Sequence, residues 1–284
     1  MLIWLLGVIV NTSFASRVDV FNVTATQDGL MIPFRISQDV NQTVNVKLTS
    51  QHHFSSLSMD RLLRYPMFEN SDEDSDSDFV LIFGHEVSIS LNSPIAQHYR
   101  HAILIPSRDD GFKLVLGSAE PSEYCHGPMV LAQLRYPLSF HTRVSLIASP
   151  NRPITPNVAA TVFSRTELTR IDTLRQEDGL IPEVYDALVN ELLSLGGAER
   201  GRFDLMPSIQ YTIYRNGYDF EPIAHIVLSP EDYLSRQPDG QYELQVVRTE
   251  GVRHSAPVLG INFLRNVGLY LNFAENEIGF CDPL

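Results

Sequence analysis

Hydrophobic and polar residues alternate over short runs along much of this chain, a period that places successive side chains on opposite faces of a β-strand. Between residues 31 and 48, two alternating runs rich in β-branched residues flank a polar break at residues 38–41, which predicts a hairpin. Further strand-like runs are at residues 79–83, 87–91, 102–105, 112–116, 128–134, 208–214, 223–228, 242–248, 257–261, 268–273 and 277–280. Short strands separated mostly by Gly, Pro or Asp predict an all-β protein.

One segment follows a different period. Apolar residues recur at helical spacing between Pro182 and Leu195, with proline at the first position and Gly196 and Gly197 after the last. This arrangement predicts a helix over residues 182–195, because proline is tolerated in the first turn and glycine favours a helix end. No heptad, solenoid or propeller period occurs in the sequence.

Composition and charge limit the partners of the chain. With 284 residues and 44% hydrophobic content, it can bury one large core or two modest ones. Thirty-four acidic and 21 basic residues give a net charge of −13, which opposes nonspecific attraction to phosphate backbones, so we expect no nucleic-acid partner. Six of the carboxylates lie in residues 69–78, a stretch without apolar residues that predicts a solvated loop.

The N-terminus has the features of a secretory signal. Residues 1–10 are apolar, and Ser13, Phe14 and Ala15 form a small-x-small site. We therefore expect a signal peptide at residues 1–15, cleavage before Ser16, and a protein that is secreted or lies in the secretory-pathway lumen with no stable membrane span. A retained anchor would look similar, although a span needs about 18 or more apolar residues.

A secretory route would expose two acceptor sites for N-glycosylation. Asn22 is followed by Thr24, and Asn41 by Thr43, so a glycoprotein is expected. Chance would also produce such triplets.

Cysteine and histidine usage predicts no cofactor and no metal. The only cysteines, Cys125 and Cys281, can form one disulfide in an oxidising compartment but need not do so. The neighbouring residues His52 and His53 would point to opposite faces of a strand, and no third ligand is spaced nearby. We interpret them as surface histidines.

Several segments resemble the pepsin-like aspartic proteases (peptidase family A1). Residues 256–280 read APVLGINFLRNVGLYLNFAENEIGF and closely resemble the C-terminal signature of that family, in which an apolar pair and a glycine precede a short helix and a closing hairpin. Similar stretches in the same order are GFKLVLG at residues 111–117, MPSIQYTI at residues 206–213 and LSPEDYL at residues 228–234. The resemblance thus covers most of the mature chain.

The resemblance implies an all-β, bilobal acid protease fold with a truncated N-terminal lobe and a short helix in the C-terminal lobe. The N-terminal lobe would comprise residues 16–136 and the C-terminal lobe residues 137–284. The strand that links the lobes and the C-terminal strand share one interlobe sheet in the family, which implies a disulfide between Cys125 and Cys281.

Chemistry of this kind needs two aspartates that share one proton, one from an Asp-Thr/Ser-Gly loop in each lobe. No such triplet occurs in the sequence. By the resemblance, the first loop corresponds to Thr49, Ser50 and Gln51, after the strand at residues 43–48. Threonine therefore replaces the first catalytic aspartate, and glutamine replaces the glycine.

The second loop corresponds to Phe163, Ser164 and Arg165, so that phenylalanine replaces the second aspartate. The middle hydroxyls of both loops, Ser50 and Ser164, remain. An alternative alignment uses Asp172 and Thr173, but Leu174 follows where glycine belongs, and residues 169–171 lack the expected apolar strand.

These features predict a catalytically inactive pseudoprotease that binds a peptide or protein in the cleft between the lobes. A first alternative is an active aspartic-type endopeptidase in which Asp60, Asp172 or Asp178 serves as an unaligned carboxylate. A second is an inert secreted structural protein. No Gly-x-Ser-x-Gly elbow marks a different nucleophile.

Overall fold

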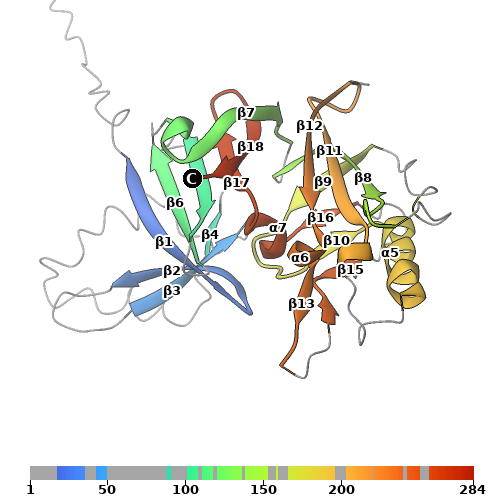
Figure 1. Ribbon diagram of the computed structural model, residues 1–284. Helices are drawn as coiled ribbons and strands as arrows, with labels where there is room; N and C mark the ends of the chain where they lie inside the picture. The colour runs from blue at the N-terminus through green and yellow to red at the C-terminus, as the bar shows by residue number, and fades with distance from the viewer. Residues whose placement is uncertain are drawn as a thin grey trace, which may run out of the picture.

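The protein is mostly β, with two large sheets and few short helices (Figure 1). The computed structural model describes residues 18–35, 43–49, 88–90, 101–107, 111–117, 120–135, 138–152, 158, 166–195, 203–219, 221–238, 242–249 and 256–284. The β-rich class predicted from the sequence is confirmed. The predicted signal peptide at residues 1–15, the acidic stretch at residues 69–78 and the strand at residues 79–83 lie outside the described residues.

In the described part, the first sheet has nine strands in the order β4-β3-β2-β1-β6-β5-β17-β18-β7. Their bounds are β1 (Asp19–Thr26), β2 (Gly29–Arg35), β3 (Thr43–Thr49), β4 (Ser88–Ser90), β5 (His101–Pro106), β6 (Gly111–Gly117), β7 (Cys125–Gln133), β17 (Gly268–Asn272) and β18 (Glu277–Pro283). Strands β2 and β3 form the predicted hairpin. The C-terminal hairpin lies between β5 and β7, as the red strands among green ones show in Figure 1.

The second sheet has seven described strands in the order β12-β11-β8-β9-β16-β10-β15. Their bounds are β8 (Ser139–Ile147), β9 (Glu167–Ile171), β10 (Asp178–Leu180), β11 (Ser208–Tyr214), β12 (Pro222–Leu228), β15 (Val246–Arg248) and β16 (Val258–Leu259). The predicted boundary between residues 136 and 137 separates β7 from β8, but the C-terminal hairpin belongs to the first sheet. The proposed lobes stay a prediction.

Two predicted strands are divided differently in the structure. Residues 242–248 form β14 (Tyr242–Leu244), which pairs with β13 (Leu234–Arg236), and then β15. The break is at Gln245, whose N–H donates to the carbonyl of Tyr233 and whose carbonyl accepts from the N–H of Asp178. Gln245 thus links the small β13–β14 hairpin to the second sheet. Of the predicted strand at residues 257–261, only Val258 and Leu259 form a strand, β16.

The predicted helix is α5 (Pro182–Ser194). It buries the apolar face formed by Val184, Ala187 and Leu188, together with Glu191, whose carboxylate lies 2.6 Å from the guanidinium of Arg152. Shorter helices are η2 (Pro121–Glu123), η4 (Phe203–Leu205), α6 (Pro230–Tyr233) and α7 (Ile261–Leu264). A helix within the C-terminal signature, expected from the resemblance, is therefore present as α7.

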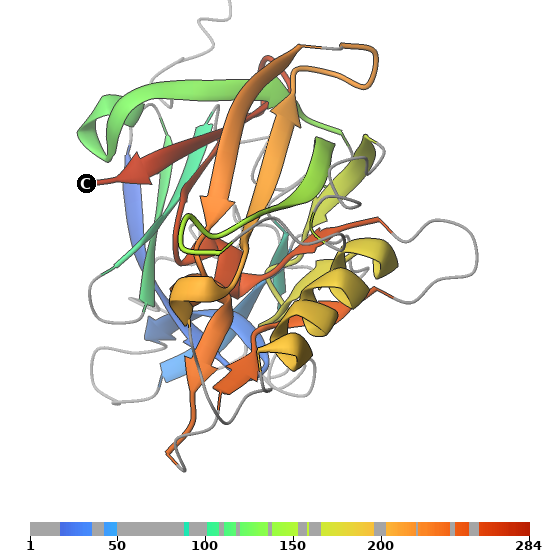
Figure 2. The same cartoon turned by 45° about the vertical axis from the view of Figure 1, so that its right-hand side comes forward.

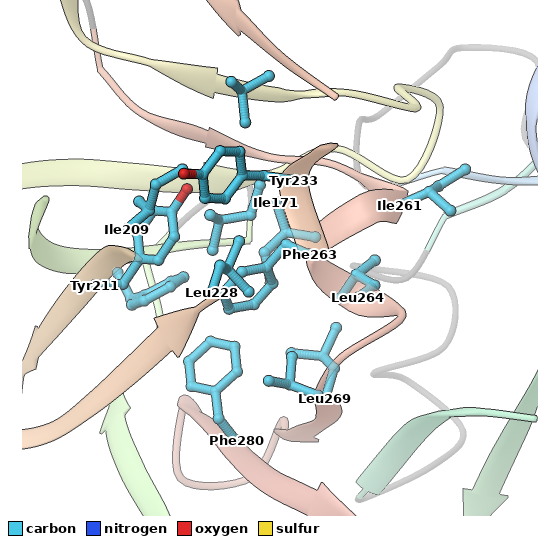
Figure 3. Packing of buried hydrophobic residues seen from close by; sticks show 14 of the residues in the cluster. Ile171, Ile209, Tyr211, Leu228, Tyr233, Ile261, Phe263, Leu264, Leu269 and Phe280 are labelled. Carbon is cyan, nitrogen blue, oxygen red and sulfur yellow. The ribbon is translucent and has the colours of Figure 1, made fainter. Parts of the chain in front are cut away.

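The main core joins the two sheets through aromatic side chains around α7 (Figure 3). Phe263 is fully buried and packs edge-on against Tyr211 of β11 and Phe280 of β18, with ring centroids 5.4 and 6.0 Å apart. Phe280 in turn packs against Phe140 of β8 at 4.9 Å. The C-terminal segment therefore holds the sheets together as well as completing one of them (Figure 2).

Candidate functional site

The residue before Thr49 meets the segment that follows β9. The Thr173 hydroxyl donates a hydrogen bond of 2.6 Å to the carbonyl of Leu48, and both residues are fully buried. The N–H of Leu30, in β2, donates to the carbonyl of Thr173 at 2.9 Å. These bonds connect the first sheet to the start of the 172–177 segment, so the end of β3 and residue 172 lie at one junction.

A glycine permits this close approach. Gly29 has φ +114°, and a Cβ atom at this position would lie 2.8 Å from the Leu174 Cα and 2.9 Å from the Thr173 carbonyl oxygen. The Gln176 side chain also donates to the carbonyl of Thr26. The β1–β2 turn is therefore packed directly on residues 173–176.

Asp172 lies immediately beyond β9. Its N–H donates to the Leu259 carbonyl at 2.9 Å, in continuation of the parallel pairing between β9 and β16. Its Oδ1 accepts from the N–H of Leu174 at 3.1 Å, and the residue is 8% exposed. The expectation that no proper strand precedes Asp172 was wrong, because β9 is a strand in which Thr169 and Ile171 are buried.

Leucine fits at position 174 without backbone strain. Among the described residues, the non-glycine positions with positive φ are Leu138 and Asn276. Leu174 therefore has an ordinary φ, and the residue that needs to be glycine at this junction is Gly29 rather than residue 174.

Asp178 is fully buried and accepts hydrogen bonds from the start of α7. Its carboxylate accepts hydrogen bonds from the N–H of Gly260 at 2.7 Å, the N–H of Phe263 at 3.2 Å and the side chain of Asn262 at 3.0 Å. Burial raises the pKa of Asp178 to about 6, although these hydrogen bonds and the charge of Arg175 oppose the rise. Asp178 was one of the carboxylates considered for catalysis, and its oxygens are occupied by structural bonds.

The same junction explains Gly260 of the signature. A Cβ atom there would lie 2.5 Å from the Glu177 carbonyl oxygen and 2.8 Å from that of Arg175. The N–H groups of Ile261 and Asn262 donate to the carbonyls of Arg175 and Gln176. The 175–177 backbone thus caps α7, and only glycine allows it to pass so closely.

The predicted degenerate loops are described only in part. Thr49 is the last residue of β3, and its side chain is not described. The remaining predicted loop residues, which lie outside the described residues, are Ser50, Gln51, Phe163, Ser164 and Arg165. Assignment of the second loop to Phe163 therefore stays a prediction, as does the possible role of Asp60. In the less favoured alternative, Asp172-Thr173, it is Thr173 that contacts Leu48.

The other predicted sites are placed as follows. Cys125 and Cys281 form a disulfide between the ends of β7 and β18. Asn22 is exposed on β1, whereas Asn41 lies outside the described residues. Over the described ranges, no group of three or more His, Cys, Asp or Glu side chains is arranged to hold a metal ion. No helix in the same ranges is long and apolar enough to cross a membrane.

Comparison with known proteins adds no identification. No protein-family model matches the chain, and no curated protein sequence is significantly similar to it.

Proposed function

We propose that this protein is a catalytically inactive homologue of the pepsin-like aspartic proteases, with a bilobal fold, and that it binds a peptide or protein segment without cleaving it. The observation that carries the proposal is the hydrogen bond from Thr173 to the Leu48 carbonyl. It sets Thr173, the residue after Asp172, against the residue that precedes Thr49, and this supports an assignment in which the two loops meet there.

At this junction the chain supplies one aspartate where the reaction needs two. Asp172 provides a carboxylate, and threonine occupies the position after Leu48. A threonine hydroxyl does not ionise near neutral pH, so it cannot share a proton with Asp172 or act as its partner base. Loss of one acid–base group alone lowers a rate by about 100- to 10,000-fold. Under the assignment of the second loop to Phe163, which the sequence favoured, neither catalytic aspartate would remain.

The retained contacts support a binding role. Gly29, Thr173 and Gly260 lie where backbones approach closely or buried hydrogen bonds are needed, and each is still suited to that place. The described contacts around residues 172–177 therefore remain in place although the chemistry is reduced. We place the protein in the secretory pathway or outside the cell, with which the Cys125–Cys281 disulfide is weakly consistent.

Cleavage and binding can be tested on the full secreted chain. Denatured haemoglobin should remain uncut between pH 3 and 6, and a displayed peptide library should yield ligands whose binding changes in Asp172→Asn but not in the exposed-site control Asp282→Asn. Cleavage that is blocked by a statyl-type inhibitor and lost in Asp172→Asn would instead support the active endopeptidase, for which the retained Asp172 is the favouring observation. Failure to select any peptide would favour the inert structural protein.

A further inference from the structure

The second sheet has one face toward the core and one face away from it. On β8, Phe140, Thr142, Val144 and Leu146 are buried, whereas His141, Arg143, Ser145 and Ile147 are partly or fully exposed. The strand register extends this division to β9, β11 and β12. His141 is opposite Leu168 of β9, and Arg143 is opposite Thr212 of β11. Thr212 is in turn opposite His225 of β12. We call the side away from the core the outer face. It is formed by His141, Arg143, Ser145, Ile147, Leu168, Arg170, Gln210, Thr212, Tyr214, Pro222, His225 and Val227.

The outer face has no aspartate or glutamate, although the chain has 34 acidic residues and a net charge of −13. Glu167 is paired with Thr142 and so belongs to the opposite side of the sheet. Asp219 and Glu221 lie in the turn between β11 and β12, beyond the strands. The outer face is therefore basic in a strongly acidic protein.

The arginines of this region have no carboxylate partner in the described part of the chain. Arg170 of β9 and Arg135, which follows β7, are both exposed. Neither forms an ion pair with another described residue. Arg143 lies over the Tyr214 ring, 5.6 Å from its centroid, which holds the guanidinium in place. Their charge is therefore not neutralised within the described structure.

A hollow of about 540 Å³ adjoins the outer face at the β11–β12 turn. It is lined by Arg135, His141, Leu168, Gly217 and Tyr218. A Cβ atom on Gly217 would lie 2.6 Å from the His141 Nε2, so the imidazole packs on bare backbone. The His141 Nδ1 is buried without a hydrogen-bond partner among the described residues, and burial together with Arg135 lowers the pKa of this ring. An anion in the hollow would pair with Arg135 and so offset the effect of the Arg135 charge on the pKa of His141.

Apolar side chains border the same region. Ile147, Leu168, Val227 and, in the turn, Tyr218 are all exposed. Mixed apolar and unpaired basic residues are typical of surfaces that bind a partner.

We propose that the outer face and its hollow bind an acidic peptide segment of a partner protein, in which carboxylate side chains pair with Arg135, Arg143 and Arg170 and intervening apolar side chains cover Leu168 and Val227. The choice of partner follows from charge complementarity, because the strand positions that form this face carry arginines and no carboxylate. Asp282 lines a second hollow with His225 and Val227, away from the three arginine contacts.

The test uses the full secreted chain and a fluorescein-labelled synthetic peptide in which glutamate alternates with leucine and phenylalanine. Fluorescence anisotropy should show binding that weakens with added salt. The double variant Arg135→Glu/Arg170→Glu should weaken it by roughly tenfold or more, because two attractive contacts become repulsive. Arg236→Glu, an exposed charge reversal on β13, is the matched control and should leave the affinity within about twofold of the original.

A milder variant separates folding from this effect. Arg170→Gln removes one charge with little risk to the fold and should weaken binding by a smaller factor. Equal binding of a peptide with glutamine in place of glutamate would overturn the proposal, as would an equal loss in Arg236→Glu. Stronger binding of an oligonucleotide or of phosphatidylserine vesicles would overturn it in favour of another class of partner.

Discussion

Asp172 and Asp178 lie in one short segment where the two sheets meet, yet their surroundings differ. Asp178 is fully buried and accepts three hydrogen bonds from the start of α7. Asp172 is 8% exposed, and in the described part of the chain only its Oδ1 is engaged, by the N–H of Leu174. Asp178 therefore uses both carboxylate oxygens to hold the fold, whereas one oxygen of Asp172 has no partner among the described residues.

Removal of the Asp178 carboxylate should have the largest effect. Asp178→Ala leaves the buried N–H groups of Gly260 and Phe263 without acceptors, and each such group costs about 1–3 kcal/mol. We expect the free energy of unfolding in urea at pH 5 to fall by about 3–5 kcal/mol. The matched variant Asp172→Ala should lose less than about 1 kcal/mol. Equal losses would remove the distinction between the two aspartates.

Asp178 should also affect the pH dependence of stability. The pKa of Asp178 is raised from 3.8 to about 6, so the folded state binds more protons between these values. The contribution of this group to the free energy of unfolding is therefore fully present below about pH 4 and is lost as the pH rises through 6, by about 3 kcal/mol in all.

Urea unfolding followed from pH 4 to 7 measures this contribution. Asp178→Asn should flatten the profile. A profile that keeps its slope in Asp178→Asn would contradict the assignment of this pH dependence to Asp178.

The link between the sheets can be weakened without touching either carboxylate. Thr173→Val keeps the shape of the side chain but leaves the buried Leu48 carbonyl without its donor, so we expect a loss of about 1–3 kcal/mol in the free energy of unfolding. Ser122→Ala, at an exposed position in η2, is the control and should change it by less than about 0.5 kcal/mol. An unchanged Thr173→Val protein would argue against this contact as the element that joins the loops.

The smallest effect is expected for Asp172→Asn. Asparagine keeps an oxygen that can accept from the N–H of Leu174, so thermal unfolding should change by less than about 0.5 kcal/mol. Peptide binding should change nonetheless, because the charge is removed. A large loss of stability would show that Asp172, too, is structural.

Elements formed by neighbouring residues were predictable. The alternation at residues 31–48 became β2 and β3, and the helical period after Pro182 became α5, because both patterns reflect one buried face of a local element. Gly260 was recognisable within its motif, although the reason for glycine, the crossing 175–177 backbone, comes from distant residues.

Features that depend on long-range strand pairing were predicted wrongly from the sequence. The segment before Asp172 lacked an apolar run, yet it forms β9 because it pairs with β8 and with β16, far along the chain. Leu174 argued against a catalytic-type loop, but the close approach there depends on Gly29 in another sheet. One sequence signal did point to Asp172, namely the Asp-Thr pair shortly before a helix.

The sequence alone is sufficient to predict the β-rich class and helix α5, because both depend on composition and local period. It also shows directly that no Asp-Thr-Gly or Asp-Ser-Gly triplet occurs. The tertiary structure adds that Thr173, next to Asp172, donates to the Leu48 carbonyl, that Asp178 is buried at the start of α7, and that the strand positions of the outer face carry no carboxylate. Such facts depend on strand register and on contacts between residues far apart in the chain, and no local pattern records them.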